Sequence, residues 1–316
     1  MLSIGVDLGG TNIACGLVTE DGKILAKKSC KTGAERPAGA ILDDLAKTAK
    51  ACVEAAGKTV EEVGFCGIAC PGVADPERGC IDYSCNLPGF LGLNLVDELK
   101  KRLPVPAFGL DNDANCAAKG EAEAGAARGV KNSVFITLGT GVGGGVILDG
   151  KMLHGFNFAG GELGHIVVEK NGLPCSCGRR GCWETVSSAT ALVRFTKEEM
   201  KKNPQSLMWR VTPDIEKTDG LTAFDAMRLG DESARKVIKI FTEYLALGIT
   251  NIVNIFQPEI LSVGGGISAE GETLLAPVRE ILEREQYSRH CAKKTVLKKA
   301  ELGNDAGIVG AALLWK

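Results

Sequence analysis

The feature that most constrains the fold is a segment that occurs twice in the chain. Ser3-Ile-Gly-Val-Asp-Leu-Gly-Gly-Thr, followed by Asp21-Gly22-Lys23, returns as Ser133-Val-Phe-Ile-Thr-Leu-Gly-Thr-Gly, followed by Asp149-Gly150-Lys151. Each copy reads as a strand, a glycine-rich turn, a second strand and an Asp-Gly-Lys turn. Two independent hairpins could share this turn chemistry, but the common order of all the features favours a duplication. We therefore expect two related lobes that face a shared ligand.

The rest of the chain alternates between strand-like and helical patterns, which indicates layered α/β lobes. At 316 residues the chain is long enough for two lobes with a cleft between them. We place the first lobe at residues 1–115, joined by a C-terminal helix at 303–316, and the second at 116–302. The pattern predicts strands at 2–6, 13–18, 24–30, 63–69, 105–110 and 259–263 and helices at 38–56, 94–103 and 305–315. It also predicts a long helical section at about 188–256, with a surface loop at 203–220 inside it.

Composition and charge exclude several classes of function. A formal charge of −2 and an isoelectric point near 6.1 provide no basic excess for a nucleic-acid backbone, so we expect no nucleic-acid partner. The chain opens directly on a buried strand, and its longest apolar stretches contain polar residues, so we expect neither export nor a membrane span. Twelve cysteines then indicate reduced thiols or metal ligands in a cytoplasmic protein.

Glycine-rich turns follow three of the expected strands. Glycine allows backbone N–H groups to approach phosphate oxygens closely, which makes each turn a candidate phosphate loop. None is a Walker loop or a dinucleotide fingerprint, because these turns lack Gly-Lys-Ser/Thr and the first is followed by a hairpin. Asp7, at the end of the first strand, is placed to hold Mg²⁺ directly or through water, the alternative being a carboxylate that caps the turn. The turns comprise Gly9, Gly10, Thr11 and Asn12, then Gly139, Thr140 and Gly141, and finally Gly264, Gly265 and Gly266.

A polar run, Asp111-Asn112-Asp113-Ala114-Asn115, lies between an expected strand and an expected helix. Functional side chains of α/β proteins gather at such strand ends. Phosphoryl transfer requires a carboxylate that accepts the proton of the acceptor hydroxyl, and Asp113 is our candidate for that base. A purely structural role for Asp113 as the helix N-cap is the alternative.

Three cysteines and a histidine form the pattern His-x₉-Cys-x-Cys-x₄-Cys, with Gly178 and Gly181 between the cysteines. The glycines permit the tight backbone that brings closely spaced thiolates together. Four protein ligands leave no open position for water, so the pattern predicts a structural zinc site rather than a catalytic one. An iron–sulfur cluster fits a histidine ligand and this spacing less well. The expected ligands are His165, Cys175, Cys177 and Cys182, flanked by Glu162 and Glu184, which could bind sugar hydroxyls or be plain surface carboxylates.

Over nearly its whole length the chain resembles the ROK family of repressors, open reading frames and sugar kinases, and within it the bacterial glucokinases. Together the motifs that carry the resemblance are highly specific. They are Asp7–Asn12, Gly67–Gly72, Asn86–Phe90, Asp111–Asn115, Leu138–Gly145, Glu162–His165, Cys175–Glu184 and Val263–Gly266.

The resemblance implies an actin-like ATPase fold of ribonuclease H-like type and an ATP-dependent kinase that phosphorylates the 6-hydroxyl of glucose. It implies Asp113 as the catalytic base, ATP and Mg²⁺ as cofactors beside the structural zinc, and a homodimer. The first two glycine turns would hold the ATP phosphates, and the third would lie near the adenosine. His165 would bind zinc through one ring nitrogen and face the sugar with the other. The residues implied to contact the sugar are Gly72, Asn86, Asn112, Asp113, Glu162, His165 and Glu184.

Other functions remain open at this stage. An N-acetylmannosamine kinase or another hexose kinase of the same family is the nearest alternative, and polyphosphate could replace ATP as the donor. A sugar-responsive regulator is the alternative from another class. We expect no helix-turn-helix, because Met1 lies only six residues before Asp7. A sensor without activity would leave Asp113 and both phosphate loops unexplained.

Overall fold

The computed structural model describes residues 1–84 and 86–316. Contacts between Cα atoms divide the chain into two compact units. Unit 1 comprises Met1–Phe135, Gly145–Gly161 and Ala300–Lys316, and unit 2 comprises Ile136–Gly144 and Glu162–Lys299. The lobe boundary expected after residue 115 lies within helix α3, Asp113–Ala124. The lobe limits given by the sequence stay a prediction.

The first sheet has the strand order β3-β2-β1-β4-β7. Strand β1 pairs antiparallel with β2 and parallel with β4, while β2 pairs antiparallel with β3 and β4 parallel with β7. The three opening strands therefore form a β-meander, and the turn between β2 and β3 is closed by a bond from Gly22 N to Thr19 O of 3.0 Å. The strands are β1 Leu2–Leu8, β2 Asn12–Thr19, β3 Ile24–Lys31, β4 Val63–Cys70 and β7 Phe108–Asn112.

The second sheet repeats this arrangement, with the order β10-β9-β8-β11-β12. Strand by strand it corresponds to the first: β10 pairs antiparallel with β9, as β3 does with β2, and β11 pairs parallel with β12, as β4 does with β7. The duplication read from the sequence is thus present in the topology. The strands are β8 Ser133–Leu138, β9 Val142–Leu148, β10 Lys151–Met152, β11 Ile260–Gly264 and β12 Val296–Lys299.

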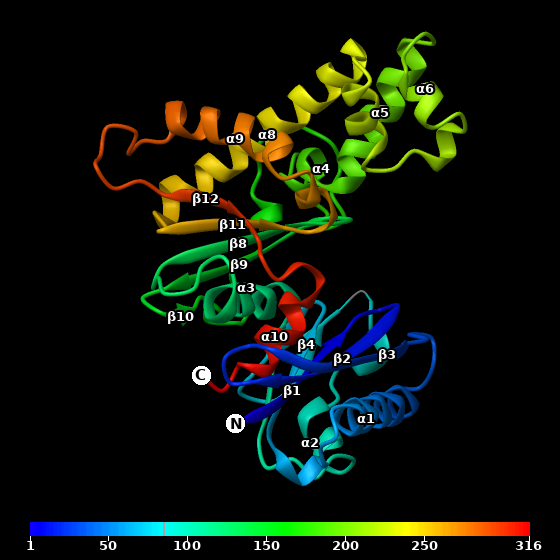
Figure 1. Cartoon of the computed structure of the whole chain (residues 1–316), viewed down its shortest axis with the longest axis vertical. Helices are drawn as coiled ribbons and strands as arrows, with labels where there is room; N and C mark the ends of the chain where they lie inside the picture. Colours follow the sequence, from blue (N-terminus) through cyan, green and yellow to red (C-terminus); the bar gives the residue numbers. More distant parts are fainter. Residues whose placement is uncertain (85) are drawn as a thin grey trace. The chain divides into compact units, whose positions relative to one another are not determined.

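Helices cover both faces of the first sheet (Figure 1). Helix α1, Ala38–Ala55, packs its buried residues on the face that carries Ile4, Val6 and Leu8. Helix α10, Ala306–Ala312, packs on the other face and against α3. Glycines line that face where α10 crosses it. A side chain would not fit there, since a Cβ at Gly5 would lie 1.9 Å from the carbonyl oxygen of Ile308. The absence of side chains there is what lets α10 approach the strands.

We predict that Gly67→Ala destabilises the protein, because a Cβ at this position would lie 1.8 Å from the carbonyl oxygen of Ala311 in α10. Overpacking of this kind costs about 1–3 kcal/mol of unfolding free energy. Thermal unfolding checks it, with Gly89→Ala as the control, since a Cβ at Gly89 meets no atom within 4 Å. Equal melting temperatures for both variants would show that α10 is not held closely against the sheet.

The long helical section expected at about 188–256 consists of separate helices in unit 2. Pro204 and Pro213 interrupt the pattern, and Asp231 starts the longest helix by accepting bonds from Ser233 N and Ala234 N at 2.7 and 3.2 Å. The segment expected as a loop contains a short helix with Met208 buried in it. The helices are α4 Glu184–Ser187, α5 Ala189–Lys202, α6 Met208–Val211, α7 Thr222–Arg228, α8 Glu232–Phe256 and α9 Glu272–Glu285.

Two smaller features complete the fold. Strand β7 begins at Phe108 rather than at Val105, because Pro106 has no N–H to donate to a neighbouring strand. A two-stranded sheet and one further helix follow β4 in unit 1. These elements are β5 Val73–Asp75, β6 Cys80–Tyr83 and α2 Leu95–Lys100, and the 3₁₀ turns are Val60–Glu62, Pro88–Phe90, Leu163–His165, Ile215–Lys217, Gly266–Glu270 and Gly303–Asp305.

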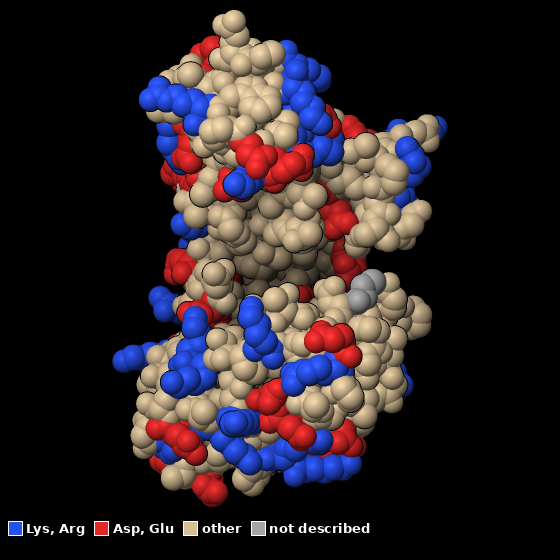
Figure 2. All heavy atoms as spheres, turned by 90° about the vertical axis from the view of Figure 1, so that its right-hand side faces the viewer, with Lys and Arg blue, Asp and Glu red and all other residues tan. Residues whose placement is uncertain are grey.

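Charged side chains of both signs are interspersed on the face drawn in Figure 2. Many are paired, as Arg102 is with Asp43 and Glu98 at 2.7 and 2.8 Å. Across residues 1–84 and 86–316, none of the helices combines the length and the apolar character that crossing a membrane requires.

Candidate functional site

The turn between β7 and α3 carries the candidate base. Asn112 is the N-cap of α3, since its Oδ1 accepts bonds from Ala114 N at 2.8 Å and Asn115 N at 3.2 Å. Asp113 is the first residue of the helix, and its Oδ1 also accepts from Ala114 N at 2.8 Å. The N-cap of α3 is therefore Asn112 and not Asp113. Asp113 places its carboxylate in the first turn of the helix.

Two more of the expected sugar contacts lie beside this turn or beside the first glycine loop. Asn112 Nδ2 donates to the carbonyl oxygen of Gly72 at 2.8 Å. Gly72 has a φ of 91°, and a Cβ there would lie 2.0 Å from Tyr83 O, so only glycine fits. Gly10 lies against Asn86, because its Cβ would be 3.1 Å from the Cβ of Asn86. In unit 1, Gly72 is therefore bonded to the residue before Asp113, and Asn86 lies against the first glycine loop.

The first glycine loop is closed by a bond from Gly9 N to Asn12 O of 3.0 Å. Thr32 supports it, since its hydroxyl donates to Gly9 O at 2.6 Å and its N–H to Thr11 O at 2.9 Å. At the end of β1, burial raises the pKa of the Asp7 carboxyl. Burial makes the charged form of Asp7 less favourable, and a cation bound beside it would offset that effect and favour the carboxylate.

The second glycine loop is built in the same way in unit 2. Gly139 N bonds to Gly141 O at 3.0 Å, and the start of α5 holds the loop, since Ala189 N donates to Gly139 O at 2.9 Å. The third glycine turn lies next to the end of β8, because a Cβ at Gly265 would be 2.4 Å from Leu138 O. Its φ of 85° also requires glycine. The second and third turns are therefore neighbours within unit 2.

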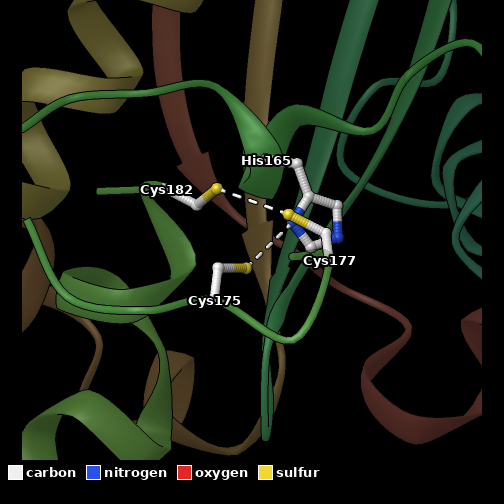
Figure 3. Close-up of side chains that lie close together, drawn as sticks. All are labelled: His165, Cys175, Cys177 and Cys182. Carbon is white, nitrogen blue, oxygen red and sulfur yellow. Dashed lines mark hydrogen bonds between the residues drawn. The ribbon is translucent and has the colours of Figure 1, made fainter. Parts of the chain in front are cut away.

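His165 and three cysteines converge on one point (Figure 3). One ligand atom from each residue lies within 4.8 Å of all the others, so the four could hold a metal ion. Cys177 Sγ is 3.6 Å from Cys182 Sγ, and Cys175 Sγ is 3.4 Å from His165 Nδ1. A tetrahedral site with usual bond lengths needs separations of about 3.8 and about 3.5 Å, respectively. The donor set and its spacing fit such a site.

The two flanking glutamates face these ligands. Glu162 Oε2 lies 4.0 Å from His165 Nε2, too far for a hydrogen bond between them but close enough for a third polar group to bond to both. Glu184 Oε1 accepts from Cys175 Sγ at 3.1 Å, and its Oε2 would be 2.5 Å from a Cβ at Gly141. Glu184 therefore lies between Cys175 and the second glycine loop.

The sequence did not single out His154, although the structure gives it a specific partner. His154 Nε2 lies 2.8 Å from Asp111 Oδ2, and this hydrogen bond raises the pKa of His154. The sequence signal was weak. His154 is one of only three histidines in the chain, but no spacing pattern links it to Asp111.

Burial and nearby carboxylates make the cysteine thiols near the Asp113 turn poor nucleophiles. Cys70 and Cys116 are fully buried, and burial, followed by the nearby Asp113 and Asp111 charges, raises their pKa well above the ordinary value. Burial likewise raises the pKa of Cys66 to about 12. These thiols stay protonated at neutral pH, which slows their oxidation.

Comparison with known proteins identifies the family. The ROK family model matches residues 3–316. The chain belongs to the ROK family. A curated relative, the glucokinase of Thermotoga maritima, is 42% identical over 313 residues, which cover 99% of this chain and 96% of the relative. The N-acetylmannosamine kinase of Citrobacter koseri is 31% identical over 315 residues, covering 99% and 98%.

A solved ROK structure confirms the fold. The crystal structure of a ROK family glucokinase from Streptomyces griseus, in complex with glucose and AMPPNP, matches with a TM-score of 0.83 and 34% identity, over 99% of this chain and 98% of that one. The predicted α/β fold of the actin-like ATPase type is therefore confirmed.

Proposed function

We propose that this ROK protein is an ATP-dependent glucokinase that transfers a phosphoryl group to the 6-hydroxyl of glucose. The observation that carries the proposal is the set of contacts in unit 1. A carboxylate at the start of α3 follows a cap that bonds to Gly72, and the glycine loop after β1 packs on Asn86. The glucokinase relatives, which match over the full chain, support glucose as the acceptor.

In this proposal Asp113 accepts the proton of the sugar 6-hydroxyl. The oxygen of that hydroxyl bonds to the γ-phosphorus of ATP while the bond between the γ-phosphorus and the departing ADP breaks. Backbone N–H groups of the first two glycine loops bind the phosphates, and the third glycine turn lies near the adenosine. Asp7 would hold Mg²⁺, directly or through water. When bound, Mg²⁺ neutralises charge on the phosphate oxygens. The residues proposed to contact the sugar, besides Asp113, are Gly72, Asn86, Asn112, Glu162, His165 and Glu184.

We also propose zinc as the metal held by His165 and the three cysteines. Thiolate and imidazole ligands in tetrahedral arrangement favour Zn²⁺ over Mg²⁺ or Ca²⁺, and four protein ligands make the site structural. Because Nδ1 is the ring atom nearest Cys175, Nε2 remains directed toward Glu162 and available to a sugar hydroxyl. The metal would thereby fix the orientation of a sugar-binding ring.

The proposal predicts selective turnover of glucose in an assay of ADP release from Mg-ATP with glucose, mannose, N-acetylmannosamine, fructose and allose. Preference for N-acetylmannosamine would support the second candidate, which the Citrobacter koseri relative favours, and would keep the mechanism. Polyphosphate is assayed as donor in parallel. Absence of turnover with every sugar and both donors would contradict a kinase and favour a sugar-responsive regulator.

Two further expectations stay predictions. The homodimer, which the resemblance implies, is tested by sedimentation equilibrium. The cytoplasmic location, which the chain's opening and its cysteines indicate, is tested by cell fractionation.

A further inference from the structure

Asp111 is a buried carboxylate with three hydrogen-bond partners. Its side chain is 5% exposed, its Oδ1 accepts from Asn112 N at 2.7 Å and from Asn115 Nδ2 at 2.9 Å, and its Oδ2 is 2.8 Å from His154 Nε2. In the part of the chain that the structure describes, no Lys or Arg lies within 4.0 Å of this carboxylate. His154 is therefore the group that compensates the buried charge, because an unpaired carboxylate is costly to bury.

Two of the donors to Asp111, Asn112 N and Asn115 Nδ2, belong to the turn that carries the candidate base. Asn112 and Asn115 flank Asp113, so the Asp111 carboxylate fixes the backbone before Asp113 and a side chain after it. The bond from His154 differs from the others, because it comes from a part of the chain 43 residues away. It holds the carboxylate from outside the turn.

His154 is itself held firmly. It follows β10, where Leu153 N bonds to Val146 O at 2.8 Å, and its own carbonyl oxygen accepts from Gly160 N at 2.8 Å. The ring of Phe158 meets the imidazole edge-on, with 6.3 Å between the centroids. These contacts close the segment 154–160 into a loop with His154 at its base, so the imidazole reaches Asp111 from a fixed position.

We propose that His154 is a positioning residue for the proposed kinase: through Asp111 it holds the Asn112–Asp113 turn so that the Asp113 carboxylate meets the acceptor hydroxyl. This inference rests on the proposed function for its catalytic consequence. His154 contacts Asp111 and not the reacting atoms, so its removal should affect kcat more than substrate binding. A misplacement of the base by a fraction of an ångström to about 1 Å lowers turnover by up to about 100-fold.

Two neutral substitutions of similar polarity separate this role from a general contribution to folding. In His154→Gln the side-chain amide can donate from the position of Nε2, whereas in His154→Asn the shorter amide falls near the position of Nδ1 and cannot reach Asp111. We expect His154→Asn to lower kcat by about 10- to 100-fold, with KM for glucose and ATP within about twofold of wild type. His154→Gln should recover most of the loss. The exposed His290 provides the matched control, and His290→Asn should behave as wild type.

Combining His154→Asn with Asp113→Asn tests whether His154 affects turnover through Asp113. If His154 acts through Asp113, the double variant should be no slower than Asp113→Asn alone, because the two changes act on one group. A further loss of 10-fold or more would overturn the inference, as would equal kcat in His154→Asn, His154→Gln and wild type.

Amide hydrogen exchange at Ala114 and Asn115 gives a readout that does not depend on turnover. Both N–H groups bond to Asn112, so their exchange should be faster in His154→Asn than in His154→Gln or His290→Asn. If wild type phosphorylates no sugar but exchange follows this order, the proposed function fails while the positioning of the turn stands. Unchanged exchange in His154→Asn would overturn the inference whatever the activity.

Discussion

Asp113→Asn is expected to lower kcat by about 10²–10⁴-fold while leaving hexose affinity nearly unchanged. The loss follows from removing the group that accepts the hydroxyl proton, for which factors of this size are usual. The fold should survive, because the cap of α3 is Asn112 and the amide oxygen of the substituted side chain can still accept from Ala114 N. Release of ADP measures turnover, and calorimetric titration with glucose measures binding.

Asp97→Asn is the matched control for this experiment. Asp97 lies in the first turn of α2, as Asp113 lies in the first turn of α3, but it is exposed and pairs with Lys100 at 3.0 Å. Its replacement should leave kcat within about twofold of wild type, since surface changes have small effects. Near-normal turnover of Asp113→Asn would remove Asp113 from the role of base. A loss of sugar binding instead would assign Asp113 to recognition rather than to proton transfer.

The parts of the fold that the sequence predicted well are those that local chemistry specifies. Strand β1 and helix α1 lie within two residues of their expected limits, because strand alternation and helical periodicity are properties of short segments. The two glycine loops could be matched from the sequence, because Asp21-Gly22-Lys23 and Asp149-Gly150-Lys151 follow them in the same order. The convergence of His165 with the three cysteines was predictable for the same reason, since His165 to Cys182 is a short segment.

What the sequence could not predict depends on contacts between distant segments. The glycines of β1 and β4 look like weak points in two strands, and only the approach of Ile308 and Ala311 explains them. The bond between His154 and Asp111 has no spacing signature, because loop geometry rather than periodicity brings the two residues together. Because both residue types serve as N-caps, the sequence left open whether Asp113 is the N-cap of α3, and the structure gives that role to Asn112.

Loss of the metal should have the second large effect, and Cys177→Ser is the variant we would use to cause it. Cys177 is exposed, so serine at this position removes a thiolate without disturbing packed side chains. We expect wild type to contain one zinc per chain and Cys177→Ser to contain almost none. If the site contributes ~3 kcal/mol to stability, the melting temperature should fall by about 6–12 °C. Elemental analysis and thermal unfolding measure both quantities.

Cys291→Ser controls for the loss of an exposed thiol, because Cys291 is exposed and lies outside the cluster. It should keep its zinc and its melting temperature. In Cys177→Ser the KM for glucose should rise, because His165 Nδ1 faces the thiolates while Nε2 faces Glu162, so a ring without its metal bond is free to turn away from the sugar. One zinc per chain in Cys177→Ser would show that the ligand set is wrong. Zinc loss with an unchanged KM would separate the metal from sugar binding and limit it to holding the Cys175–Cys182 segment.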